Sequence, residues 1–179
     1  MTSALFLANA ELVLERARTG DPAALEALYR AFESPVYNLA RRICRTPEDA
    51  EDVLQETFIE VYRSLQRYRG DGSIWGWIRT IAASKAFMRL RHNKYRDTDT
   101  LKEDAASARR SDPHLQMDLE AALERLSETA RAVVWLHDVE GYTHEEISTM
   151  MGRTVSFSKS QLARAHDRLR RWLGEEQSA

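Results

Sequence analysis

The stretch that decides the fold of this 179-residue chain is Tyr142–Arg171, YTHEEISTMMGRTVSFSKSQLARAHDRLRR. Thr143 followed three residues later by Glu146 is a capping box, which predicts that a short helix begins there. Gly152 tolerates a positive φ and is therefore a natural residue at the end of that helix. After almost no spacer a second helix is predicted, because its apolar residues share one face: Leu162, Ala165, Leu169 and Trp172.

The charge of this second helix lies away from its apolar face. A tight turn followed by a basic amphipathic helix is typical of a helix-turn-helix, whose second helix enters a major groove of DNA. An ordinary solvated helix packed on its neighbours is the alternative. The basic residues are Lys159, Arg164, Arg168, Arg170 and Arg171, with Asp167 the only acid among them.

Composition limits the class of protein. Seven Gly and four Pro, with long apolar patterns of period 3.6, predict an all-α fold with a substantial core. No apolar run reaches the roughly 18–20 residues of a membrane span, and the N-terminus does not resemble a signal peptide. Cys44 is the single cysteine and the five His are scattered, so neither a disulfide nor a metal site is expected. We expect a cytoplasmic protein without metal or cofactor.

Helix signals divide the chain further. Asp21-Pro22 and Thr46-Pro47 each pair a cap with Pro at the first helical position, predicting helices to about residues 44 and 68. A glycine-rich turn precedes a long helix over about 74–95. Residues 97–114 contain one Leu, no aromatic residue and no period, so they predict a flexible linker. Helical pattern resumes at 115, and Ser127 caps a helix through Val139. The prediction is two small helical domains, 1–96 and 115–179, joined by this linker.

Charge is segregated although the net charge is only −2. Residues 47–62 hold six acids and no Lys or Arg, and four of the acids form one helical stripe without a basic i+4 partner: Asp49, Asp52, Glu56 and Glu60. Acids in a first turn favour the helix dipole, and charged stripes are often only solvated. The alternative is a docking surface for a basic partner.

A basic stripe follows the glycine-rich turn. Lys85, Arg89, His92 and Arg96 share one face of the long helix, with Tyr68, Trp75 and Trp77 close upstream. Cations beside aromatic rings suit a nucleic acid with an unstacked base, because phosphates pair with the cations and a base stacks on a ring. Trp77, together with Ile74, Ile78 and Ile81, is interpreted instead as core.

Two blocks of sequence resemble extracytoplasmic-function (ECF) sigma factors, the small members of the sigma-70 family. DAEDVLQETFIEVYRSLQRYRGDGSIWGWIRTIA (49–82) resembles their region 2, and LERLSETARAVVWLHDVEGYTHEEISTMMGRTVSFSKSQLARAHDRLRRWL (123–173) resembles their region 4. The resemblance implies a non-enzymatic initiation factor that binds core RNA polymerase and promoter DNA and transcribes a specialised, stress-responsive regulon. It also implies a cognate anti-sigma factor. The alternative is a stand-alone helix-turn-helix regulator that does not need polymerase; an enzyme is a distant third.

The resemblance also implies a role for each surface. The acidic stripe with Gln55 corresponds to the surface that docks on the clamp helices of polymerase: Asp49, Asp52, Gln55, Glu56 and Glu60. The turn and the basic helix correspond to the part that captures the −10 element: Tyr68, Arg69, Gly70, Asp71, Gly72, Ser73, Trp75, Ser84, Lys85, Arg89 and His92. The recognition helix reads the −35 element through Ser156, Phe157, Lys159, Ser160, Gln161, Arg164 and Arg168.

Four positions depart from the family pattern. Thr80 and Ser84 stand where the family has a phosphate-pairing Arg and a base-facing Asn, which predicts altered −10 contacts. Gln161 replaces an Arg, which predicts an atypical −35 sequence. Ser158 replaces a core aliphatic residue, so we expect loose packing of the recognition helix at that end.

Overall fold

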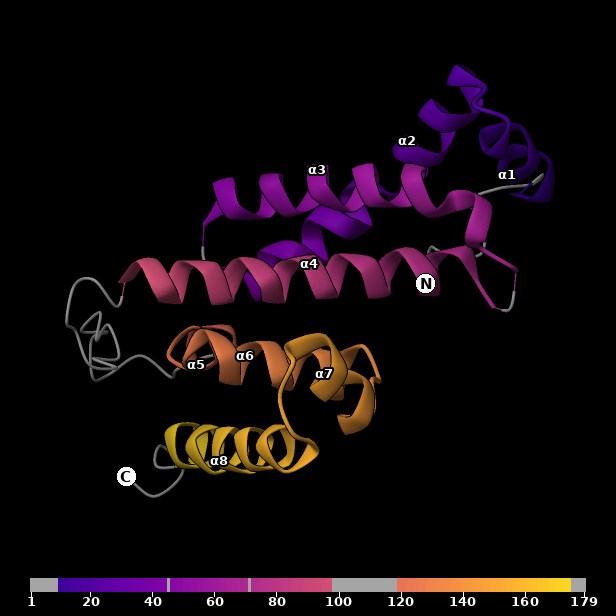
Figure 1. The fold of residues 1–179 in the computed structure, drawn as a ribbon. Coiled ribbons are helices and arrows are strands. Elements are labelled where there is room, and N and C mark those ends of the chain that lie inside the picture. Colours follow the sequence, from indigo (N-terminus) through magenta and orange to yellow (C-terminus); the bar gives the residue numbers. More distant parts are fainter. Residues whose placement is uncertain (1–9, 45, 71, 98–118, 175–179) are drawn as a thin grey trace. The chain divides into compact units, whose positions relative to one another are not determined.

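The computed structural model describes residues 10–44, 46–70, 72–97 and 119–174, and these ranges are helical with no strand. The chain forms two compact units, residues 1–89 and 90–179, and the division falls within a long helix. Figure 1 shows the order of the helices. The predicted linker lies almost wholly in 98–118, outside the described residues, so the domain boundaries stay a prediction.

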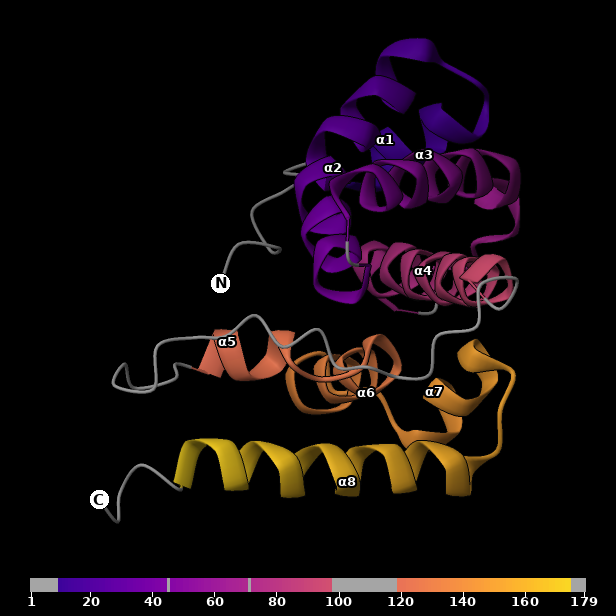
Figure 2. The ribbon, with the colours of Figure 1, turned by 90° about the vertical axis from the view of Figure 1, so that its left-hand side faces the viewer.

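The first unit contains three helices, a 3-10 turn and most of a fourth helix. They are α1 (Ala10–Arg18), α2 (Pro22–Ile43), α3 (Pro47–Ser64), the turn Leu65–Arg67 and α4 (Ile74–Asp97). In Figures 1 and 2, α3 and α4 run side by side. The core of the first unit is built by apolar residues at helical spacing on α2, α3 and α4. All of them are nearly inaccessible to solvent: Leu28, Phe32, Val36, Val53, Phe58, Val61, Ile78 and Ala82.

Side-chain caps fix where α2 and α3 begin. The Asp21 carboxylate accepts a hydrogen bond of 2.9 Å from the amide of Ala23, and the Thr46 hydroxyl accepts one of 3.1 Å from the amide of Asp49. Each bond satisfies a backbone donor that the first turn leaves without a partner. Both predicted helix starts are confirmed.

The sequence-based prediction missed α1. Leu14 and Ala17 of this helix are buried, with 9% and 4% of their surface exposed, and α1 packs against α2. Nine residues carry too few periods of an apolar pattern to stand out in a sequence. Arg18, at the end of α1, nevertheless contacts Tyr68 at the glycine-rich turn.

The second unit contains the predicted helix-turn-helix. It is built from α5 (Leu119–Glu124), α6 (Glu128–Val134), a π-helical segment (Trp135–Val139), α7 (His144–Met151) and α8 (Val155–Gly174). Both bonds of the capping box at Thr143 and Glu146 are present, and Gly152 adopts the left-handed conformation with φ of 59°. The capping box, the glycine turn and the helix through Val139 are therefore confirmed.

The apolar face of α8 packs as predicted. Leu162, Ala165 and Leu169 are buried, and Trp172 lies under the guanidinium of Arg125, 4.7 Å from the ring centroid. α8 packs against α5, α6 and α7. Across the part of the chain with described coordinates, no helix combines the length and hydrophobicity needed to cross a membrane.

Candidate nucleic-acid and protein-binding surfaces

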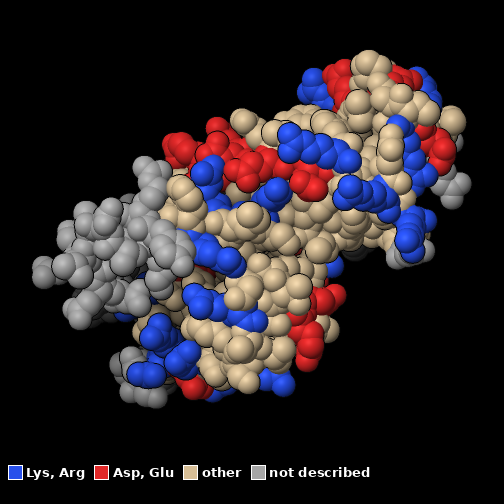
Figure 3. Space-filling model, viewed as in Figure 1, with Lys and Arg blue, Asp and Glu red and all other residues tan. Residues whose placement is uncertain are grey.

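The acidic stripe lies along α3, where carboxylates gather on the face seen in Figure 3. The Asp52 and Glu56 side chains are 52% and 50% exposed, and that of Glu60 is 42% exposed, whereas Asp49 retains 19%. Asp49 also accepts a hydrogen bond of 2.9 Å from the Thr46 hydroxyl. Asp49 therefore helps to stabilise the start of α3, whereas the more exposed acids remain accessible to a partner.

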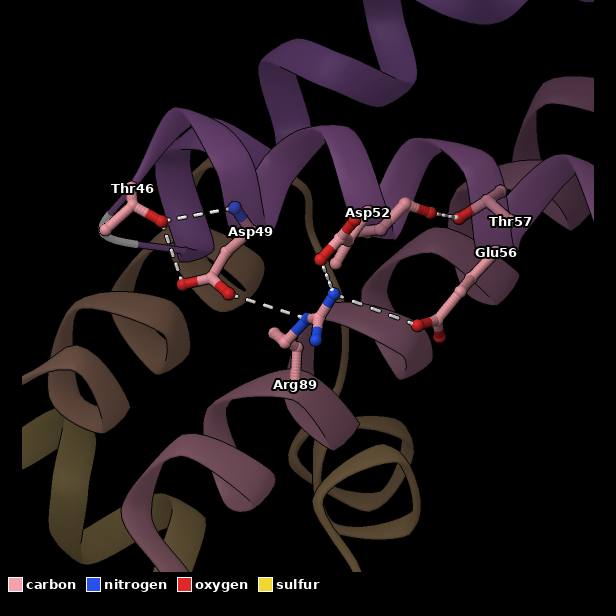
Figure 4. Close-up of polar contacts among 7 residues, drawn as sticks. Thr46, Asp49, Asp52, Glu56, Thr57 and Arg89 are labelled. Carbon is pink, nitrogen blue, oxygen red and sulfur yellow. Dashed lines mark hydrogen bonds and ion pairs between the residues drawn. The ribbon is translucent and has the colours of Figure 1, made fainter. Parts of the chain in front are cut away.

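The acids have basic partners on the neighbouring helix. Figure 4 shows the guanidinium of Arg89, from α4, pointing into the stripe. It contacts Asp52 directly and lies 3.5 Å from Asp49 and 4.0 Å from Glu56. One turn away, the Lys85 ammonium lies 3.8 Å from Glu60.

These contacts join two surfaces that the sequence assigned to different ligands. Pairing rules within one helix consider only positions i+3 and i+4, so the prediction of an unpartnered stripe missed partners 25–40 residues away in sequence. The Arg89 side chain is 22% exposed in this arrangement. Its charge is therefore largely neutralised by α3 in the chain alone.

The glycine-rich turn is held in place by its own residues. The Tyr68 hydroxyl donates a hydrogen bond of 2.6 Å to the carbonyl of Gly72, and the Tyr68 ring lies 5.0 Å from that of Trp77. Gly70 has a φ of 82°, a conformation that favours glycine. The Ser73 hydroxyl accepts a bond of 3.0 Å from the Gly76 amide and so caps α4. Asp71 lies outside the described residues.

Arg18, at the end of α1, anchors the same turn. Its guanidinium donates a hydrogen bond of 2.5 Å to the backbone carbonyl of Tyr68 and pairs with Glu15 at 2.6 Å. The sequence gave no signal for this contact, because fifty residues separate Arg18 from Tyr68. α1 therefore supports the turn from outside it.

Trp75 and Trp77, the two tryptophans next to the glycine-rich turn, are both half-buried. Trp75 stacks on Phe32 of α2, with ring centroids 5.9 Å apart and planes 2° apart. Trp77, expected in the core, instead leans on Tyr68, while Ile78 is the fully buried residue. Thr80 is exposed, and its hydroxyl donates a hydrogen bond of 2.9 Å to the carbonyl of Gly76. Ser84 and Lys85 are half-buried, and His92 is exposed.

The predicted base-reading residues share the accessible side of α8. Phe157 and Gln161 are half-buried, and the Arg153 guanidinium lies 5.7 Å from the centre of the Phe157 ring. The others are exposed: Ser156, Lys159, Ser160, Arg164 and Arg168. The structure thus brings all seven residues together on one helix, leaving its apolar stripe to the core.

Ser158 is fully buried, and its hydroxyl is paired. The Ser158 Oγ lies 3.0 Å from Nδ1 of His144, the first residue of α7. The expectation of loose packing at this position is wrong, because a buried polar contact replaces the aliphatic one. Sequence reasoning missed His144, since fourteen residues separate the partners.

The His144 ring belongs to a longer polar chain. It stacks on His137, with centroids 4.6 Å apart. Asp138 accepts from His137 Nδ1 at 2.8 Å and from His166 Nε2 of α8 at 2.6 Å. Burial raises the pKa of Asp138, but the two histidine hydrogen bonds outweigh it and leave the pKa below its usual value. Among the residues with described positions, no group of three or more His, Cys, Asp or Glu could hold a metal ion.

Comparison with known proteins bears on both units. Residues 28–96 match the family Sigma-70 region 2, and residues 116–169 match Sigma-70, region 4. The RNA polymerase sigma factor CarQ of Myxococcus xanthus is 35% identical over 167 residues, which cover 90% of this chain and 96% of CarQ. The ECF RNA polymerase sigma factor SigE of Mycolicibacterium smegmatis is 35% identical over 172 residues, 89% of this chain and 66% of SigE.

A solved structure supports the fold. The sigma factor RpoE, in a co-crystal with the anti-sigma factor NepR from Bartonella quintana, superposes with a TM-score of 0.53 at 23% identity, over 79% of this chain and 91% of that one. The chain belongs to the sigma-70 family of RNA polymerase sigma factors, and within it to the ECF group. The region 2 match covers most of the first unit and the start of the second, and the region 4 match lies within the second unit.

Proposed function

We propose that this ECF sigma factor divides initiation among three surfaces. The acidic stripe of α3 docks on core polymerase, the turn at 68–73 with α4 captures the melted −10 strand, and α8 reads the −35 duplex. The observation that carries this proposal is the presence, in one chain, of an accessible acidic face on α3 and a basic recognition helix on α8. A stand-alone regulator would need only the second.

The docking step rests on the exposure of the acids. Asp52 and Glu56 keep about half of their side-chain surface accessible while they contact Arg89, so a basic partner reaches them without unfolding the unit. Gln55, on the same side of α3, is exposed as well. Partly exposed charge pairs are weak in water, which makes the exchange of Arg89 for a polymerase cation inexpensive.

Neutral isosteres test the docking surface. Asp52→Asn with Glu56→Gln should weaken binding to core polymerase by about fivefold to thirtyfold, since each exposed charge contact contributes up to about 1 kcal/mol. Replacing these acids with Lys would place positive charges beside Arg89 and could destabilise the fold. A loss of binding would then not distinguish docking from stability. The control is Glu26→Gln with Glu33→Gln, which makes the same change in charge on α2.

Equal polymerase affinity for the wild-type chain and Asp52→Asn/Glu56→Gln, with both folded, would move the docking surface away from the stripe. A control that weakens binding as much as the test pair would show that net charge, and not this face, governs the affinity. Binding is measured by titration of labelled chain with core polymerase at fixed ionic strength.

Regulation by an anti-sigma factor forms part of the proposal. The sigma factor RpoE of Bartonella quintana was co-crystallised with the anti-sigma factor NepR, and CnrH was solved in complex with the cytosolic domain of CnrY. We infer that a partner of this kind covers the acidic helix and the recognition helix of this chain. It should displace core polymerase at equilibrium, and a complex of all three that still binds promoter would contradict that arrangement.

The site of action follows from the ligands. We infer that the chain acts in the cytoplasm, where core polymerase and promoter DNA are found. None of the three proposed surfaces requires a catalytic group of its own, because the chemistry of initiation belongs to polymerase.

A further inference from the structure

The buried hydroxyl of Ser158 points to an unassigned role within the recognition unit. Ser158 occupies the apolar face of α8, which otherwise continues with Leu162, Ala165 and Leu169. A buried hydroxyl without a partner is destabilising, so the contact with His144 is required at this position. The nearest aliphatic stripe residue, Leu162, lies one turn further along the helix.

His144 is itself fixed from two directions. It follows the N-cap Thr143, and its ring stacks on His137 at 4.6 Å. We call these linked side chains the histidine network: His137, Asp138, His144, Ser158 and His166. This network includes two residues of α8 that lie eight positions apart. Ser158 contacts His144 at the start of α7, and His166 contacts Asp138 in the π-helical segment that precedes α7.

The first of these two α8 residues lies among the base-reading residues. Phe157 and Lys159 flank Ser158 directly, and Gln161 follows less than one turn later. A shift of Ser158 toward or away from α7 therefore moves these side chains by a similar amount. Hydrogen bonds to base edges need donor and acceptor within a few tenths of an ångström of their best separation, so such a shift changes which bases fit.

We propose that His144 and Ser158 are positioning residues for the reading of −35 bases. Their hydrogen bond fixes the distance between the first two turns of α8 and the start of α7. This inference rests on the proposed function of α8, and it adds two residues that contact no DNA in that proposal. Aliphatic side chains at this position would let α8 slide against α7. The hydrogen bond between His144 and Ser158 is directional and does not.

Burial and the neighbouring positive charges favour a neutral His144 ring and outweigh the two nearby carboxylates, Glu145 and Asp138, which favour a charged one. Glu145 neighbours it on α7, His137 and Asp138 face it from the π-helical segment, and Lys159 faces it from α8. Burial, followed by the charges of His137 and Lys159, lowers the pKa of His144. A neutral imidazole retains one acceptor nitrogen, which suits a serine hydroxyl as donor.

The test uses holoenzyme assembled from the full chain and core polymerase, with a pool of promoter duplexes randomised at the −35 element. The readout is the ratio of dissociation constants for a scrambled and a selected −35 duplex. His144→Leu or Ser158→Ala should lower this ratio by about twofold to tenfold, the factor given by one hydrogen bond of ordinary net strength. His144→Asn keeps a polar atom near the Nδ1 position and should restore most of the ratio.

Two comparisons separate positioning from stability. Ser148→Ala removes another buried serine, whose hydroxyl donates a hydrogen bond of 2.8 Å to the Glu145 carbonyl of its own helix, so it should leave the ratio unchanged. The double variant His144→Leu/Ser158→Ala should lose no more than either single variant, because both remove the same contact.

The outcomes are distinct. If His144→Leu and Ser158→Ala weaken scrambled and selected duplexes equally, as a loss of folded protein would, the inference is overturned and the proposed function stands. If wild-type holoenzyme selects no −35 sequence, the proposed reading by α8 fails, and this inference fails with it. A lowered ratio with rescue by Asn supports the inference.

Discussion

Gln161 is the residue whose chemistry most directly predicts a change in sequence preference. It is half-buried on the accessible side of α8. Arg in this place favours guanine through O6 and N7, whereas Gln offers one donor and one acceptor, matching adenine N6 and N7. Gln161→Arg should therefore shift selection from randomised −35 duplexes toward guanine at the facing base, with a discrimination of roughly 1–3 kcal/mol. Identical motifs from both proteins would place Gln161 away from the bases.

His144 predicts how stability of the recognition unit depends on pH. Its pKa in the folded chain lies below the ordinary 6.5, with burial the main cause. The unfolded chain therefore binds the proton more readily. The stability that neutral His144 contributes is fully present above pH 6.5 and is lost as the pH falls below that value. Thermal unfolding at pH 7.5 and 5.5 should show a larger loss for wild type than for His144→Asn. An equal loss in both proteins would assign the pH dependence to other groups.

At the scale of elements, the pairing of α3 with α4 predicts a conditional role for Arg89. In the chain alone the carboxylates of α3 contact its guanidinium. In the docking that we propose, polymerase would take up those carboxylates in holoenzyme. Arg89→Ala should thus leave the salt dependence of oligonucleotide binding nearly unchanged for the chain alone. In holoenzyme it should reduce the slope for the single strand by about 0.7. Arg30→Ala, at an exposed pair on α2, is the control.

An equal change of slope in the two states would contradict this conditional role. It would indicate that DNA, and not polymerase, competes with the acids for Arg89. An unchanged slope in both states would place Arg89 off the path of the strand and leave it as a tie between the helices.

The elements themselves were largely predictable, since their signals are local. Asp21, Thr46 and Thr143 each cap a helix that begins where the sequence indicates. Contacts between elements were not predictable. Arg89 reaches Asp52 across 37 residues and His144 reaches Ser158 across 14, and no spacing rule within one helix or turn encodes such pairs.

For the whole molecule, the division into two compact units predicts that local damage stays local. Thr46→Ala and Thr143→Ala remove equivalent caps from α3 and α7, each at a cost of about 1 kcal/mol. Hydrogen exchange should then lose protection only in the unit that carries the substitution. The two variants control each other, and loss of protection across both units from either one would show a single cooperative structure.

The order of the two regions along the chain was also evident from sequence, because each region carries its own motif block. The residues that complete each surface were not: Arg18 supports the turn at 68–73 from a helix that precedes the matched region. Family resemblance locates the surfaces, and the details that belong to this chain arise from its own long-range contacts.

The contact between Ser158 and His144 determines what can be transplanted when sigma factors are engineered for new promoters. A recognition helix cut at residue 155 would carry Ser158 into a host whose α7 has no histidine to meet it, burying a hydroxyl without a partner. An exchangeable cassette should therefore span 135–174, which includes both the histidine network and the whole of α8. Designers who swap only the base-reading residues should keep Ser158 and His144 as a pair, or replace both with apolar side chains.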